Sequence, residues 1–145
     1  MKKQSGFSLL ELLIVLAVLG ILAALSVPHL LRSKAAANEG AALASVRTIM
    51  TAQMTYASTV GGGFYGSLAE LQSTGLIDNV LGSGSKDGYN YTLTGDNTNT
   101  GYTVTSVPVQ YPTTGTRGFF GDSTGVLRYT SDGSAPTPAS PPIGG

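Results

Sequence analysis

The stretch GFSLLELLIVLAVLGILAALSVP, residues 6–28, decides how the rest of the chain is organised. From Leu12 to Leu31 no Asp, Glu, Lys or Arg interrupts the sequence. A helix of twenty residues is about 30 Å long, which matches the hydrocarbon thickness of a bilayer. We therefore expect residues 9–31 to cross a membrane once.

Glu11 directly precedes this uncharged run, inside the expected membrane span and four residues after Phe7. A carboxylate inside a membrane helix is costly, by roughly 2.5–3.5 kcal/mol at the helix centre on insertion scales. An opposite charge placed next to it recovers part of that free energy. The position of Glu11 therefore predicts a positively charged partner.

Gly20 and Pro28 lie inside the apolar run. Because proline has no backbone N–H, we expect Pro28 to kink or locally open the helix, with Ser26 bonding the freed carbonyls. Gly20 has two open interpretations. It contributes helix flexibility, or it permits close helix packing, as small residues do in membranes.

The helical pattern continues beyond the membrane, so that one long helix is expected over residues 7–59. The predicted apolar face of its second half carries Leu43, Val46, Met50, Met54 and Ala57, and the predicted polar face carries Asn38, Ser45, Arg47, Thr48 and Thr55. The three glycines at 61–63 are expected to end the helix.

Residues 60–131 are expected to form a globular head of class α+β. The capping-box pattern Ser67-Leu68-Ala69-Glu70 predicts a short helix, and 78–88 is expected to be a loop. Alternating segments at 89–93 and 102–107, with a hairpin over 117–129, predict three to four antiparallel strands packed on the long helix. The Pro/Gly/Ser-rich residues 132–145 are expected to be disordered.

Composition excludes several function classes. The 145 residues include no cysteine and one histidine, and 8 basic residues balance 8 acidic ones. Disulfides, thiolate metal sites and cysteine nucleophiles are therefore absent, and overall charge does not favour a polyanionic partner. We expect no enzymatic activity, no cofactor and no small-molecule substrate.

Few side chains outside the N-terminal stretch suggest a site. His29 is interpreted as a polar residue at the membrane boundary. Asp96, Asn99 and Asp122, with Asn97, are weak candidates for calcium ligands, but their spacing is not that of an EF-hand and Asx-rich turns are common. The main aromatic residues are expected to lie in the core: Tyr89, Tyr91, Tyr102, Phe119 and Phe120.

The N-terminal residues closely resemble those of type IV pilins and type II secretion pseudopilins. The resemblance covers residues 2–31 and rests on the basic Lys2 and Lys3, the sequence GFSLLELLIV at 6–15, and the uninterrupted apolar run. Gly20 and Pro28 stand at the positions that the family uses. Residues 115–120 and 125–128 also look like the final hairpin of many pilin-like proteins.

This resemblance implies a pilin-like fold and a defined processing step. Prepilin peptidase would cleave a leader of residues 1–6 between Gly6 and Phe7, and the new terminus at Phe7 would be N-methylated. The subunit would wait in the bacterial inner membrane as a single-pass protein. An inner-membrane assembly platform would then add it to a homo-oligomeric helical filament, at the cell surface or in the periplasm.

In such a filament, the Phe7 amine of one subunit can meet Glu11 of a neighbour. We hypothesise that this charge pair selects and registers incoming subunits. A type II secretion pseudopilin is the alternative, although Asp87-Gly88-Tyr89 lacks the family's Trp- and Pro-containing calcium-loop pattern. A membrane-anchored periplasmic binding module is less favoured, because an anchor does not need Gly6-Phe7 before Glu11. The sequence leaves motility, adhesion, DNA uptake and secretion open.

Overall fold

The computed structural model describes residues 1, 5–96, 98 and 100–144. Contacts divide the chain into two units, Met1–Ser33 and Lys34–Gly145. The basic leader residues Lys2 and Lys3 lie outside the described residues.

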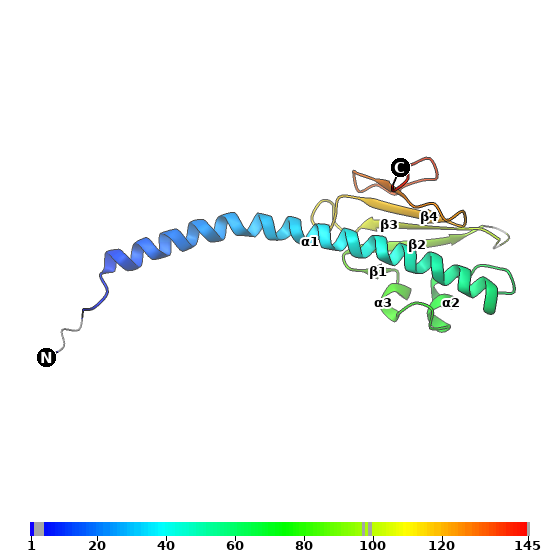
Figure 1. Cartoon of the computed structure of the whole chain (residues 1–145), viewed down its shortest axis with the longest axis horizontal. Helices are drawn as coiled ribbons and strands as arrows, with labels where there is room; N and C mark the ends of the chain where they lie inside the picture. The colour runs from blue at the N-terminus through cyan, green and yellow to red at the C-terminus, as the bar shows by residue number, and fades with distance from the viewer. Residues whose placement is uncertain (2–4, 97, 99, 145) are drawn as a thin grey trace. The chain divides into compact units, whose positions relative to one another are not determined.

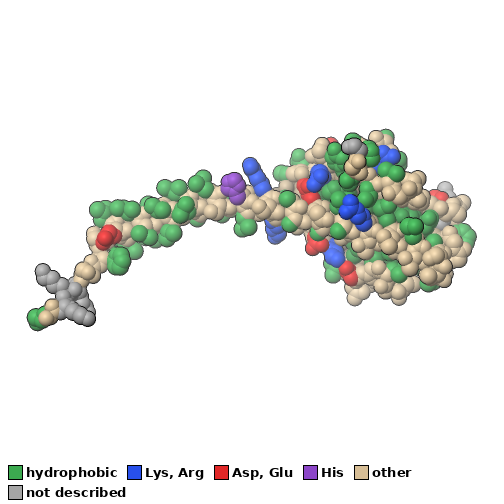
Figure 2. All heavy atoms as spheres, viewed as in Figure 1, with side chains coloured by type: hydrophobic (Ala, Val, Ile, Leu, Met, Phe, Trp, Pro, Cys, Tyr) green, Lys and Arg blue, Asp and Glu red, His purple; other side chains and the backbone are tan. Residues whose placement is uncertain are grey.

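Helix α1, Leu9–Thr59, contributes to both units and agrees with the expected long helix. In the first unit its side chains are exposed on every side, from Leu9 to Ser33. Figure 2 shows hydrophobic side chains over the visible surface of this segment. Among the described residues, one helix is long and apolar enough to cross a membrane, and it is α1. An apolar helix that the chain itself does not cover needs lipid or other protein around it.

The second unit contains the rest of α1, two short helices and one antiparallel sheet (Figure 1). The short helices are α2, Leu68–Ser73, and α3, Asn79–Gly82. The strands, which neighbour one another in chain order, are β1 Ser85–Lys86, β2 Tyr89–Gly95, β3 Tyr102–Pro108, β4 Gly118–Asp122 and β5 Arg128–Thr130. The predicted α+β architecture is confirmed, with five strands in place of three to four.

The additional strand comes from the segment that was expected to be a loop. β1 pairs with β2, with Ser85 opposite Asn90 and Lys86 opposite Tyr89. Asp87 and Gly88 form the connecting turn, with φ angles of 51° and 75°. An Asp-Gly pair with two positive φ angles is typical of a two-residue hairpin, so this dipeptide was the signal that the prediction missed.

The core lies between α1 and one face of the sheet. Val46 and Ile49 of α1 are fully buried and cluster with Tyr89 and Phe119 of the sheet. Alternation along β2 and β3 brings the core-facing residues to the same side. Four of the five aromatic residues predicted to lie in the core belong to this cluster: Tyr89, Tyr91, Tyr102 and Phe119. Phe120 is also buried, at 2% exposure, but it lies on the opposite face of β4.

The buried face of α1 is rotated relative to the predicted one. Met54 was expected in the core but is 68% exposed, whereas Ser45, expected on the polar face, is buried. The buried residues of α1 are Ala35, Glu39, Ala42, Ser45, Val46, Ile49, Ala52 and Gln53. The small residues on this face allow the sheet to approach closely, and Glu39 and Gln53 form hydrogen bonds there. Because the buried face of α1 contains small and polar residues, hydrophobic periodicity alone does not identify it.

Glu39 fixes the loop between β3 and β4 to α1. The backbone N–H and the hydroxyl of Thr116 each donate to Glu39 Oε1 at 2.7 Å, and Arg117 Nε donates to Oε2 at 2.7 Å. One residue earlier, Asn38 donates to the carbonyl of Thr114 at 3.0 Å. Desolvation raises the pKa of Glu39, but the hydrogen bonds from Thr116 and Arg117 outweigh it and hold the pKa below its ordinary value.

Gln53 makes a second polar anchor, further along α1. Its side-chain amide donates to the carbonyl of Gly66 at 2.6 Å and accepts from the Gly66 N–H at 2.9 Å. Gln53 is fully buried. The two bonds hold the segment that enters α2, whose own start is fixed by the predicted capping box of Ser67 and Glu70.

The C-terminal residues contradict the expectation of disorder. Residues 134–143 make backbone hydrogen bonds with the segment around β5, including one from Tyr129 N to the carbonyl of Pro141 at 3.0 Å. Arg128 and Pro142 form an isolated antiparallel bridge. The composition offers little apolar surface, but an unpaired strand edge supplies backbone partners that composition does not reveal.

Replacing Glu39 by Gln should lower the free energy of unfolding by about 1–3 kcal/mol at pH 7, because charge-assisted hydrogen bonds are lost. Glu39 has a lowered pKa in the folded state, so its stabilisation is present above the ordinary glutamate pKa of roughly 4.3 and is lost as pH falls further. The difference between the two proteins should therefore shrink toward pH 3. Denaturation in detergent micelles, followed by tyrosine near-UV dichroism, measures it. A difference that is the same at pH 7 and pH 3 contradicts this account.

Replacing Gln53 by Leu should lower the free energy of unfolding by about 1–3 kcal/mol, because the N–H and the carbonyl of Gly66 would both lose their hydrogen-bond partner. Thr48→Ala, at an exposed site on the same helix, should change stability by less than about 0.5 kcal/mol. The same denaturation experiment compares the two variants. Equal effects would show that the Gly66 anchor contributes nothing specific.

Candidate functional site at the start of helix α1

Glu11 and Ser8 close the N-terminal end of α1 together. The backbone N–H of Ser8 donates to Glu11 Oε2 at 2.9 Å, and the N–H of Leu10 donates to the Ser8 hydroxyl at 3.3 Å. Both bonds satisfy backbone donors that have no partner within the helix. The carboxylate also lies in the first turn of α1, where the helix dipole favours negative charge. Within the single chain, Glu11 therefore has a local role.

The sequence contained a signal for this role. Ser8-Leu9-Leu10-Glu11 has the same spacing as Ser67-Leu68-Ala69-Glu70, where Ser67 N donates to Glu70 Oε2 at 2.7 Å. The sequence-based prediction of a cap covers only the second of these. Glu11 also lies in the expected membrane span, and there its charge is a more conspicuous feature than its capping position.

Gly6 and Phe7 precede α1 and are both exposed, Phe7 at 89%. A Cβ added to Gly6 would meet nothing within 4 Å. A larger residue at position 6 would therefore meet no steric obstacle among the described residues, and the backbone there does not have a positive φ angle that would favour glycine. The pair is accessible to another protein.

Gly20 and Pro28 lie within the uninterrupted helix. A Cβ at Gly20 would also meet nothing within 4 Å, so the single chain does not need glycine there. Pro28 has no N–H for the carbonyl of Ala24, four residues earlier. Ser26 was expected to compensate, but its hydroxyl donates to the carbonyl of Leu22 at 2.7 Å. That expectation is wrong, because the hydroxyl reaches back one turn from its own position.

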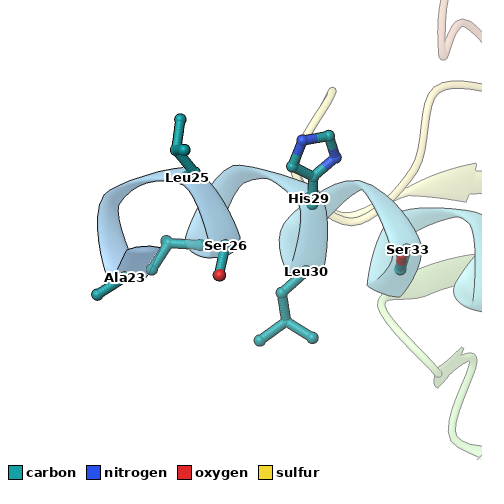
Figure 3. Close-up of a pocket in the computed structure, with 7 residues that line it drawn as sticks. Ala23, Leu25, Ser26, His29, Leu30 and Ser33 are labelled. Atoms are coloured by element: carbon teal, nitrogen blue, oxygen red, sulfur yellow. The ribbon is translucent and has the colours of Figure 1, made fainter. Parts of the chain in front are cut away.

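His29 lies on an open stretch of α1 (Figure 3). The residues around the nearby hollow, Ala23, Leu25, Ser26, Val27, His29, Leu30 and Ser33, all belong to this one helix. Leu25 and His29 project from one side of the helix and Leu30 from the opposite side. The hollow is thus the surface of a single helix. Over the residues that the structure describes, no three His, Cys, Asp or Glu side chains gather into a metal-binding group.

Asp96 and Asp122 line a common hollow at one end of the sheet, beside Gly101 and Ser123. Each carboxylate closes its own turn. Asp96 accepts from the N–H groups of Thr98 and Thr100, and Asp122 accepts from Thr124 N at 2.9 Å. The other two calcium candidates, Asn97 and Asn99, lie outside the described residues.

The electrostatics of Asp96 fit this structural role. Desolvation raises its pKa, but the hydrogen bonds from Thr98 and Thr100 outweigh it and keep the pKa below the ordinary value. The local threonines therefore stabilise the ionised carboxylate. Turn formation accounts for Asp96 and Asp122 without a metal ion.

Comparison with known proteins identifies the N-terminal segment. Residues 1–27 match the family described as the prokaryotic N-terminal methylation motif. The type IV major pilin protein PilA of Myxococcus xanthus is 36% identical over 56 residues, which are 39% of this chain and 26% of that protein. The type II secretion system core protein G of Aeromonas hydrophila is 40% identical over 55 residues, 38% of each chain.

Core protein G of Vibrio cholerae is 41% identical over 56 residues, 39% of this chain and 38% of that protein. The matched part thus spans between about a quarter and two fifths of the length of these curated relatives. No solved structure gives a significant match. The chain therefore carries the methylation motif and is similar, over part of its length, to a type IV pilin and to type II secretion core proteins.

Proposed function

We propose that this chain is a structural subunit of a type IV pilus-like filament, without enzymatic activity, that is held in the bacterial inner membrane before assembly. The observation that carries the proposal is the first half of α1. It is apolar, exposed on every side and preceded by the start of the methylation motif. A surface of this kind suits lipid before assembly and the helices of neighbouring subunits afterwards.

Processing is the first step of the proposed function. We propose that prepilin peptidase cleaves between Gly6 and Phe7 and that Phe7 becomes N-methylated. The exposure of both residues, and the absence of any steric need for glycine at position 6, support this step. Cleavage there would place a charged amine four residues before Glu11.

Glu11 then has two successive partners in the proposal. In the single chain its carboxylate accepts from Ser8 N at 2.9 Å. In the filament it would also pair with the Phe7 amine of a neighbouring subunit, since a carboxylate has several acceptor positions. A misplaced subunit would leave both charges without their partner, so the pair favours correct register.

Gly20 fits close packing in this proposal. Neither steric crowding in the chain nor a positive φ angle explains a glycine in the middle of a membrane helix. A small residue there would let a neighbouring helix approach closely. Pro28 would supply the site at which α1 can lose a hydrogen bond and lengthen during assembly.

A pseudopilin of type II secretion is the second candidate. The similarity to two core G proteins, at 40% and 41% identity, favours it as much as the pilin similarity favours a pilus. Both candidates would assemble through the same kind of N-terminal helix, so this helix does not distinguish them. They differ in filament length and in cellular role. Electron microscopy of surface filaments sheared from a deletion strain separates them. Loss of long filaments supports the pilus, whereas persistent filaments with a secretion defect support the pseudopilin.

Glu11→Ala and Glu11→Gln should both reduce assembly to a small fraction of that of the unchanged protein, while membrane insertion and processing continue. Glutamine can still accept from Ser8 N, so it keeps the helix cap and loses only the charge. Quantification of sheared filaments and of membrane-inserted subunit measures both effects. If the Glu11→Gln variant assembles normally and the Glu11→Ala variant does not, capping explains Glu11 and the charge-pair proposal fails.

Mass spectrometry of the subunit should find a terminus at Phe7 that carries one added methyl group. Replacing Gly6 by a bulky residue should block cleavage. It should leave the fold of the second unit intact, since a Cβ at position 6 would meet none of the described residues within 4 Å. A membrane-bound protein that retains Met1 in cells with active prepilin peptidase would instead support a permanent anchor.

A further inference from the structure

The connection between β3 and β4 begins with a closed turn over residues 109–114, called the Tyr111 turn below. Gln110 N donates to the Thr114 hydroxyl at 3.0 Å, and Thr114 N donates to the carbonyl of Gln110 at 2.8 Å. Val109 N donates to the carbonyl of Gly88 at 2.9 Å. Because these bonds already hold the backbone, a partner that binds the turn would not have to order it.

Two large apolar side chains of the Tyr111 turn are open to solvent. Val109 is 54% exposed and Tyr111 is 56% exposed. The ring of Tyr111 has a defined position, since one of its edges lies so close to Gly133 that a Cβ added there would clash with it. Residues 109–113 carry no charge. Single exposed apolar residues are common on protein surfaces, so the place of this pair in the fold decides what it means.

The Tyr111 turn lies at the end of the second unit at which α1 enters it. Asn38 Nδ2 donates to the carbonyl of Thr114 at 3.0 Å, and Glu39 holds the end of the same connection. Ala35 is the first buried residue of α1, so these two contacts belong to the first turns of its packed part. Figure 1 shows the yellow to orange connection between β3 and β4 beside the cyan part of α1.

The chain holds this end of the second unit close to the expected membrane span. Seven residues separate Leu31, the last residue of that span, from Asn38. A helix of seven residues covers about 10 Å. The turn between β4 and β5 lies at the other end of the sheet, since β3 and β4 are antiparallel. The Tyr111 turn therefore belongs to the part of the second unit that stays nearest to the bilayer along the chain.

We propose that the Tyr111 turn binds the headgroup region of the bilayer, with Tyr111 and Val109 making the contact. The inference rests on the proposed function in one respect, the residence of the first half of α1 in a membrane, and it extends that lipid contact to the second unit. Tyrosine is enriched at membrane–water interfaces, because its ring is apolar and its hydroxyl is polar. Asp87 of the neighbouring turn is exposed and acidic, so the contact depends on the ring and not on attraction to anionic lipid.

Two side chains give a weak contact by themselves, but α1 links the second unit to the membrane. Binding of the Tyr111 turn is then an intramolecular step, and a short linker gives it a high effective concentration. A contact too weak to recruit a free protein can therefore hold the second unit against the bilayer. The contact would limit the directions in which the subunit is presented before assembly.

The first test measures how close two turns lie to the lipid headgroups. Because the chain has no cysteine, Thr113→Cys or Ser123→Cys can each carry a fluorophore at one exposed place. The labelled full chains are inserted into phosphatidylcholine vesicles in which some lipids carry a nitroxide on the headgroup, a quencher of nearby fluorophores. Quenching should be at least about threefold stronger at position 113 than at position 123. Equal quenching at the two positions would overturn the proposal.

A matched pair of substitutions tests the contact itself in the labelled Thr113→Cys chain. Tyr111→Ser should lower the headgroup quenching by about threefold, because it removes most of the apolar area of the contact. Phe64→Ser removes an aromatic side chain of similar exposure, 52%, from the segment after α1, and it should leave the quenching unchanged. The same quenching in the two variants would mean that Tyr111 does not contact the bilayer.

Two further measurements separate this proposal from its alternatives. A fluorophore at Leu19→Cys, with nitroxides on the lipid acyl chains, reports whether the first half of α1 is in the membrane. Quenching at position 19 without headgroup quenching at position 113 overturns the contact of the Tyr111 turn and leaves the proposed function in place. Absence of quenching at position 19 contradicts membrane residence and, with it, both proposals. A signal at position 113 that follows the protein-to-lipid ratio, and not the nitroxide content, would identify a second copy as the partner and overturn the lipid contact.

Discussion

The second unit depends on the burial of one face of α1 against the sheet. Val46 and Ile49 are fully buried there, and the face continues through small residues such as Ala42. Two polar anchors limit how the rest of the chain is placed on it. Glu39 holds the loop before β4, and Gln53 holds the segment before α2. Because both side chains are buried and engaged in hydrogen bonds, any rotation of the helix would leave costly unpaired groups.

The first half of α1 has the opposite property, since its side chains from Leu9 to Ser33 are all exposed. About twenty residues of exposed Leu, Ile, Val and Ala cannot remain in water, so a bilayer or other copies of the helix must cover them. Glu11 is the exception in this surface. The carboxylate of Glu11 accepts a hydrogen bond from the backbone N–H of Ser8, which gives that N–H a partner at the start of the helix. This bond does not supply a positive charge to pair with the carboxylate. A helix of this composition is consistent with the proposed subunit, which would move from lipid into a filament.

The outer side of the sheet shows how little apolar area is needed to protect a strand edge. Residues 134–143 use backbone hydrogen bonds and one buried proline to cover β5 and the face at Phe120. Ile143, at the end of the segment, also packs against the core cluster. The order of this segment therefore depends on contacts that its composition does not reveal.

The sequence by itself determined the N-terminal segment, the long helix and the α+β class. A helix long and apolar enough to span a membrane follows from composition over consecutive residues, and the methylation motif is read at fixed spacing, so neither needs knowledge of distant contacts. Tertiary structure decided which face of α1 is buried. Burial of the polar side chains of Ser45 and Gln53 is favourable only when residues far away in the sequence pack around them or form hydrogen bonds with them. It also decided the order of residues 134–143, since their partners belong to the strand edge at β5. Contacts between residues far apart in the chain have no local pattern, and for this reason the sequence alone does not predict these features.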